Sequence, residues 1–183
     1  MLTIYIKSNK LFNHQTNKFI TVKEQTLYME HSLNTIAKWE SIHHVSFFDE
    51  FNSKKQDVTN EKLLSYIKCM ILNKYDKNCL YFLSLENYKS IEEYMANPMS
   101  ALKTKQKKGG VYASITAEEI YYRMVALQIP FTCEHWHINR LFKLIETCSF
   151  YQSQSMDTQK KKINYRDRRK LNEQRLEKLG TNG

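Results

Sequence analysis

The residues best suited to chemistry lie in one short segment, where Cys133, His135 and His137 surround Trp136. On a helix Cys133 and His137 would be one turn apart, so both could reach a single metal ion, with His135 as a further ligand. Structural zinc sites usually show paired ligands at close spacing, and no fourth ligand can be named. Metal binding is therefore the minority hypothesis, and packing in a core or an interface is favoured.

The thiol of Cys133 could also act as a nucleophile if a helix N-terminus and His137 lowered its pKa, but no third, orienting group can be identified. The sequence contains no P-loop, GxGxxG, GxSxG or HExxH motif. His43 and His44 are interpreted as a surface or loop pair. We therefore expect a protein that is not an enzyme and uses no cofactor.

Two helices would position the Cys/His segment. Thr116 and Glu119 have the spacing of a capping box, so a helix should begin after Thr116. Pro130 should end that helix, and Thr132 is the expected N-cap of the next one. The second helix has an apolar stripe at helical spacing, which consists of Ile138, Leu141, Phe142, Ile145 and Cys148.

The N-terminal part, residues 1–98, combines strand and helix patterns. Alternation in residues 2–6 and a second apolar run at 18–22 predict a small β-hairpin. Helical spacing in residues 27–41 predicts a helix against which the hairpin packs, with Trp39 as a core anchor. Further helices are expected after Thr59 and after Ser84, and residues 75–83 fit either a strand or a helix.

Residues 99–114 contain four lysines and Gly109-Gly110, which is typical of a linker. A helical hairpin at 115–150 follows, and 151–183 is predicted to be a polar tether (151–162) and a short charged helix. The predicted fold class is mainly α (α+β): an N-terminal β-hairpin packed on a domain of about five helices, plus a basic C-terminal helical arm.

Composition supports this interpretation. The 183 residues include only two prolines and four glycines, which favours helices over a β-sandwich. No apolar run is long enough to span a bilayer and no leader pattern is present, so we expect a protein without membrane contact. The four cysteines form no CxxC pair and are expected to be reduced thiols.

The net charge is +9, and residues 151–183 carry nine Lys/Arg against four Asp/Glu. This concentration of positive charge points to an anionic partner or an interaction arm. The basic residues that we assign to the arm are Arg166, Arg168, Arg169, Lys170 and Arg175.

Three blocks, LYMEHSLNTIAKWES (27–41), EEIYYRMVALQIPFTCEHWHINRLFKLI (118–145) and LNEQRLEKLGTNG (171–183), resemble small proteins of tailed-bacteriophage virion-morphogenesis modules. These proteins are commonly labelled tail assembly chaperones or phage structural proteins. The resemblance implies a non-catalytic role in the host cytoplasm, holding tail components such as the tape-measure protein soluble until the tail tube forms, with a homo-oligomer as one arrangement.

The family brings no established binding residues, so the candidate partner-binding residues follow from chemistry alone: Trp39, Tyr121, Tyr122, Trp136, Leu141 and Phe142. Each of them could simply be a core residue, and for any single one the core interpretation is the favoured one. Two alternatives to the chaperone remain open. One is a structural component of the tail or neck that stays in the virion, and the other is a protein that binds nucleic acid through the basic arm.

Overall fold

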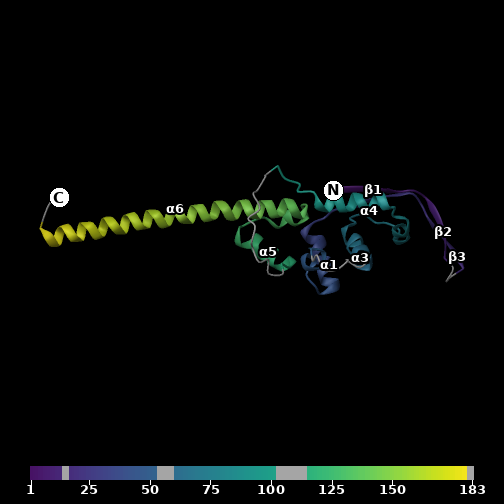
Figure 1. Cartoon of the computed structure of the whole chain (residues 1–183), viewed down its shortest axis with the longest axis horizontal. Coiled ribbons are helices and arrows are strands. Elements are labelled where there is room, and N and C mark those ends of the chain that lie inside the picture. Colours follow the sequence, from purple (N-terminus) through teal and green to yellow (C-terminus); the bar gives the residue numbers. More distant parts are fainter. Residues whose placement is uncertain (14–16, 53–59, 102–114, 181–183) are drawn as a thin grey trace. The chain divides into compact units, whose positions relative to one another are not determined.

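The computed structural model describes residues 1–13, 17–52, 60–101 and 115–180 (Figure 1). It divides the chain into two units, Met1–Lys143 and Leu144–Gly183. The described chain is mainly α-helical with antiparallel strands at its N-terminus, which confirms the predicted fold class. Most of the predicted linker 99–114 lies outside the described residues.

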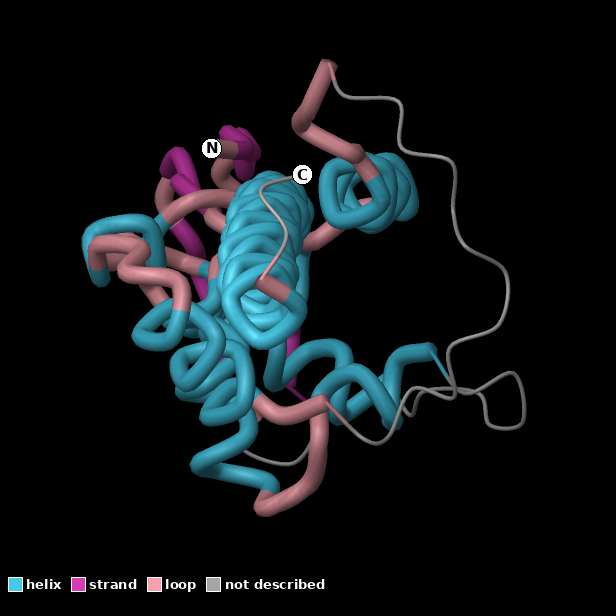
Figure 2. Tube along the Cα trace, turned by 90° about the vertical axis from the view of Figure 1, so that its left-hand side faces the viewer, coloured by secondary structure: helices cyan, strands magenta, loops and turns pink. Residues whose placement is uncertain are grey.

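Four short strands open the chain (magenta in Figure 2): β1 (Leu2–Ile6), β2 (Asn9–Asn13), β3 (Lys18–Val22) and β4 (Gln25–Met29). β1 pairs with β4 and β2 pairs with β3, both antiparallel. The two ladders keep one register, since Ile6 faces Gln25 and Asn9 faces Val22. The predicted hairpin is thus one long ribbon, and the expected pairing of residues 2–6 with 18–22 is wrong.

The beginning of the predicted helix 27–41 is also wrong, because Leu27 and Met29 belong to β4 and only Leu33–His43 forms α1. Both residues are fully buried, as strand alternation requires. Ser32 caps α1, its Oγ accepting a hydrogen bond from the N–H of Thr35. Residues 27–41 therefore contain a strand, a cap and a helix in succession.

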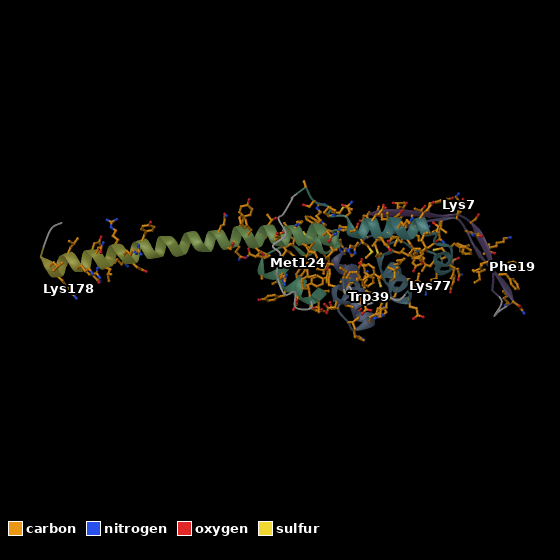
Figure 3. All side chains as sticks on the ribbon, viewed as in Figure 1. Lys7, Phe19, Trp39, Lys77, Met124 and Lys178 are labelled. Carbon is orange, nitrogen blue, oxygen red and sulfur yellow. The ribbon has the colours of Figure 1, made fainter. Side chains whose placement is uncertain are left out.

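The unit Met1–Lys143 continues with short helices: α2 (Phe47–Asn52), α3 (Asn60–Met70), the 3₁₀ helix η1 (Lys77–Phe82), α4 (Leu85–Ala96), α5 (Ala117–Ala126) and the 3₁₀ helix η2 (Phe131–His135). Trp39, labelled in Figure 3, is completely buried, as is Met124 of α5. The rings of Phe47, Phe51 and Tyr66 surround the Trp39 indole. This aromatic cluster joins α1, α2 and α3 into one core.

The predicted caps have different outcomes. Ser84 caps α4 through its Oγ, which confirms that prediction, whereas Thr59 lies outside the described residues. α5 begins after Thr116 as expected, but the Thr116 side chain makes no cap hydrogen bond. Thr132 is not the N-cap of the next helix, because it lies inside η2 and that helix begins only at Ile138.

The last helix, α6 (Ile138–Leu179), is continuous over 42 residues. The polar tether predicted at 151–162 is therefore wrong. That segment contains no Gly or Pro, and its Gln, Lys and Met residues are good helix formers. Its polarity alone therefore did not indicate an interruption of the helix. In the part of the chain that the structure describes, no helix has the length and apolar character needed to cross a bilayer.

Candidate functional site

The segment Tyr28–Ser32 lies at the centre of the first unit, with backbone hydrogen bonds on two sides. On one side, Glu30 N–H donates to Met70 O at 3.0 Å and Leu72 N–H donates to Tyr28 O at 2.8 Å. On the other side, the N–H of Ile138 donates to the carbonyl oxygen of His31 at 2.8 Å. Two histidines lie where this segment meets the start of α6. They are His31 and His137, and both are buried.

The two imidazoles are in edge-to-face contact, with 5.1 Å between their ring centroids. His31 Nδ1 is hydrogen-bonded to the hydroxyl of Tyr66, which is completely buried on α3. Three parts of the fold thus each contribute one ring. His31 comes from the segment between β4 and α1, Tyr66 from α3, and His137 from the residue before α6. The result is a polar cluster inside an otherwise apolar and aromatic core.

A second tyrosine completes the cluster. The Tyr94 hydroxyl donates to Glu30 Oε1 at 2.5 Å, and the Tyr94 carbonyl accepts from His137 Nε2 at 3.0 Å. His137 Nδ1 accepts from the N–H of Asn139 at 3.3 Å. A neutral His137 with its proton on Nε2 satisfies both contacts, whereas a protonated ring would turn its Nδ1–H toward another N–H.

We call Glu30, His31, Tyr66, Tyr94 and His137 the buried cluster, and burial shifts the pKa values of its two imidazoles and two phenols. Burial, and to a smaller extent the neighbouring His137, lower the pKa of His31 to about 3. Burial also lowers the pKa of His137, although the Tyr94 carbonyl partly opposes this shift. The pKa values of Tyr66 and Tyr94 are raised, again chiefly by burial. The imidazoles and phenols are therefore neutral at physiological pH.

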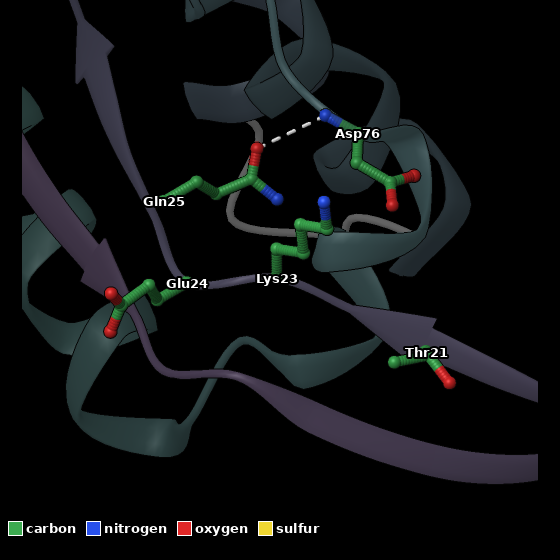
Figure 4. A pocket seen from close by; sticks show the side chains of 5 residues that line it. All are labelled: Thr21, Lys23, Glu24, Gln25 and Asp76. Atoms are coloured by element: carbon green, nitrogen blue, oxygen red, sulfur yellow. Dashed lines mark hydrogen bonds between the residues drawn. The ribbon is translucent and has the colours of Figure 1, made fainter.

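The imidazoles and Tyr66 of this cluster are shielded from solvent, and therefore from a dissolved substrate. Such an arrangement is better suited to stabilising the fold than to catalysis. An open depression of about 320 Å³ lies elsewhere, lined by Thr21, Lys23, Glu24, Gln25 and Asp76 (Figure 4). There Gln25 Oε1 accepts a hydrogen bond from the N–H of Asp76 at 3.0 Å, which ties β4 to the start of η1. None of the cluster's groups reaches this depression.

The structure gives no support to the metal hypothesis. Cys133 and His137 are buried, but His135 is exposed and lies 3.5 Å from Glu134. Both nitrogens of His137 already have partners. Among the described residues no three His, Cys, Asp or Glu side chains are grouped as metal ligands would be. All four cysteines are free thiols, and burial of Cys133 also argues against its role as a nucleophile.

The six candidate partner-binding residues divide into three kinds. Trp39 and Leu141 are completely buried, so they are core residues and the prediction of a surface role for them is wrong. Tyr122 alone is strongly exposed, at 73%. The half-buried remainder each have a neighbour: Tyr121 donates to Glu134 at 2.7 Å, Trp136 lies under Arg140, and Phe142 contacts Phe48.

Sequence reasoning missed Glu40, a buried carboxylate near the end of α1. Its Oε1 accepts from the N–H of Phe47 and its Oε2 from the N–H of Ala117, both at 2.8 Å. These donors belong to the first residues of α2 and α5, so one side chain caps two helices. No signal in the sequence separates Glu40 from an ordinary surface glutamate.

The arm residues lie on the C-terminal part of α6. Arg168, Arg169, Lys170 and Arg175 are exposed, and Arg169 pairs with Glu173 at 3.1 Å. Arg166 lies within the helix, and its side chain is outside the described residues. The predicted basic helical arm is therefore present as part of a longer helix.

Comparison with models of known protein families finds no match. Comparisons with curated proteins and with solved structures likewise find none. The function must therefore be argued from the residues and their geometry.

Proposed function

We propose that this chain is a non-enzymatic bacteriophage assembly factor, a tail assembly chaperone that binds tail components in the host cytoplasm during virion morphogenesis. The phage assignment rests on the three sequence blocks that resemble such proteins. The binding role rests on one structural observation, the exposure of α6. Every described side chain of this helix from Ser149 to Leu179 is exposed.

A helical stretch whose side chains are all exposed gains little stability from them. Pairs such as Arg169–Glu173 contribute only about 0.2–0.5 kcal/mol each. Most helical stability in proteins comes from packing an apolar face against another element. Among the described side chains of this stretch, six are large, apolar and exposed: Phe150, Tyr151, Tyr165, Leu171, Leu176 and Leu179.

Contact with a protein partner would bury these side chains and stabilise the helix. The charges on the same stretch are mixed, since Asp167, Glu173 and Glu177 accompany the arginines and lysines. A mixed surface of this kind fits another helix with charges of both signs, as a long helical tail component would offer. The buried cluster holds the first unit together and needs no substrate.

The experiment is capture of the tagged full-length chain from infected cells, with the bound virion proteins identified by mass spectrometry. A variant with Leu171, Leu176 and Leu179 replaced by alanine should retain at least tenfold less of a tail protein, because each lost side chain removes up to about 1.5–3 kcal/mol of burial. Leu85→Ala is the matched control, since Leu85 is 71% exposed on α4. Recovery of no virion protein with the unaltered chain would refute the proposal.

Exposed basic residues favour a second candidate function, nucleic-acid binding by the arm. Arg168, Arg169 and Lys170 are consecutive and accessible, and phosphate contacts by such residues make binding fall steeply as salt rises. Replacing the three by glutamine should then abolish a mobility shift of DNA or RNA. An unchanged shift would exclude the arm as the binding element.

A further inference from the structure

Helix α5, labelled in Figure 1, has two apolar stripes, and only one of them faces the core. The core-facing stripe is completely buried and consists of Ala117, Ile120 and Met124. The second stripe has the helical spacing i, i+3, i+4 and i+7 and consists of Glu118, Tyr121, Tyr122 and Val125. Tyr122 is 73% exposed and Val125 is 59% exposed, so the described part of the chain leaves this stripe largely uncovered.

Phe131 of η2 continues the second stripe beyond the end of the helix. Its ring centroid lies 6.2 Å from that of Tyr121, and its side chain is 56% exposed. We call Tyr121, Tyr122, Val125 and Phe131 the α5 patch. Exposed apolar side chains that are grouped in this way are typical of a surface that binds a protein partner.

The α5 patch is accompanied by negative charge, although the whole chain has a net charge of +9. Glu118 lies within the exposed stripe itself. Glu134 accepts a hydrogen bond from the Tyr121 hydroxyl at 2.7 Å. Arg123 falls on the side of α5 away from the stripe, because successive helical residues are about 100° apart. The patch therefore suits a partner that combines apolar and basic side chains.

The arm has such a surface on one of its faces. Its exposed leucines are Leu171, Leu176 and Leu179. At about 100° per residue, Arg168 and Arg175 fall between these leucines, and both arginines are exposed. Glu173 and Glu177 fall on the opposite side of the helix. Although the charges of the arm are mixed as a whole, its leucine face is therefore positively charged.

We infer that the leucine face of the arm of one copy packs on the α5 patch of a second copy. The leucines would cover the patch, and the two arginines between them would lie beside Glu118 and Glu134. Apolar side chains and charges of opposite sign thus match on the two surfaces. α6 is continuous from Ile138 to Leu179, and a helix cannot bring its last turns back to the residues just before its first turn. The arm that covers the patch therefore belongs to another copy.

This self-association goes beyond the proposed chaperone role and does not depend on which tail component binds. The chaperone role uses the same leucines, so a tail component that binds the arm would displace the second copy. A patch of four side chains gives a small contact, and small interfaces are weak and exchange readily. The exposed leucines would thus stay covered until a tail component replaces the second copy.

The first test is sedimentation velocity of the purified full-length protein at increasing concentration. The mass should rise above that of one chain, and less so at high salt, because exposed charges are screened. Tyr122→Ala should raise the dissociation constant at least about tenfold. Tyr81→Ala is the matched control and should leave it unchanged, since Tyr81 is 68% exposed on η1.

A charge reversal tests the electrostatic part of the contact. Glu118→Lys should weaken association at least about tenfold, because it places a positive charge opposite the arginines of the arm. Glu92→Lys changes the net charge of the chain by the same amount at an exposed position of α4, and it should have no effect. All of these variants should melt as the unaltered protein does, since the substituted side chains are exposed.

Mixing two defective variants tests the contact between arm and patch itself. The patch variant combines Tyr122→Ala with Val125→Ala and keeps an intact arm. The arm variant has Leu171, Leu176 and Leu179 replaced by alanine and keeps an intact patch. Mixed pairs should form at concentrations at which each variant alone remains a single chain, because the arm of the first variant fits the patch of the second.

The inference is overturned if the unaltered protein remains a single chain at every concentration, or if the patch variant associates normally. Absence of mixed pairs, when the unaltered protein does associate, would also overturn it and would assign the association to contact between two arms. The patch variant should still capture a tail protein from infected cells, since its arm is intact. Failure of the unaltered chain to capture one would refute the chaperone role and leave self-association standing.

Discussion

The carboxylate of Glu40 accepts a hydrogen bond from the backbone N–H of Ala117, 77 residues further along the chain, at 2.8 Å. Its other oxygen accepts from the N–H of Phe47 at the same distance. A negative charge at two positive helix ends satisfies donors that helices leave unpaired. It also explains why the side chain of Thr116, the residue before α5, makes no cap hydrogen bond.

Replacing Glu40 by alanine should therefore destabilise the protein by about 2–4 kcal/mol, because two buried N–H groups lose their acceptor. Urea unfolding followed by circular dichroism measures this difference. Glu119→Ala, an exposed glutamate of α5, is the control and should change stability by less than about 0.5 kcal/mol. Equal effects of the two substitutions would show that Glu40 does not act as a shared cap.

Ser84 and Thr116 both look like N-cap residues in the sequence, but only Ser84 makes a cap hydrogen bond in the structure. Ser84→Ala should cost about 1 kcal/mol, since the Ser84 Oγ accepts from the N–H of Asn87 at 3.2 Å. Thr116→Ala should cost much less, because its side chain caps nothing. Thermal denaturation of both variants gives the comparison, and a larger loss for Thr116→Ala would contradict the structure.

Stability should fall as pH is lowered from 7, because of the buried imidazoles. The folded-state pKa of His31 is lowered to about 3 from its usual 6.5. Between these values the unfolded chain binds more protons, so stability present above pH 6.5 is progressively lost toward pH 3. At pH 5 the loss from His31 alone amounts to about 2 kcal/mol.

Denaturant unfolding at pH 7 and pH 5 tests this dependence. His31→Gln should reduce the difference between the two pH values, whereas His135→Gln should leave it unchanged, since His135 is 64% exposed. If His31→Gln retained the full pH dependence, the loss would belong to other groups.

The parts of the fold that could be predicted from the sequence are those set by local patterns. Ser84 marks a helix start through its side-chain hydroxyl, and the structure places the start of α4 there. Pro130 indicates a nearby helix end, and α5 ends at Ala126, four residues before it. Residues 27–29 could not be assigned in this way, because Leu27 and Met29 fit strand alternation as well as Met29 fits helical spacing. Pairing with β1 settles the choice, and that pairing is a tertiary contact.

The buried cluster and the Glu40 cap could not be predicted from the sequence either, because both depend on tertiary contacts. His31 and Tyr66 are 35 residues apart, and Glu30 and Tyr94 are 64 apart. No spacing rule links such positions, so each residue looks ordinary in its own segment. Conversely, Cys133, His135 and His137 are close in sequence, and this proximity suggested a site. The fold does not form that site, because Cys133 and His137 are buried whereas His135 is exposed.

The most direct test of the proposed assembly role is quantitative mass spectrometry of purified phage particles beside lysate of the infected cells that produced them. A tail assembly chaperone should be abundant in the lysate, recovered there with a tail protein, and absent from the finished particles. Detection of the chain in the particles at a fixed ratio to the tail proteins would contradict the chaperone role and identify a structural component of the virion.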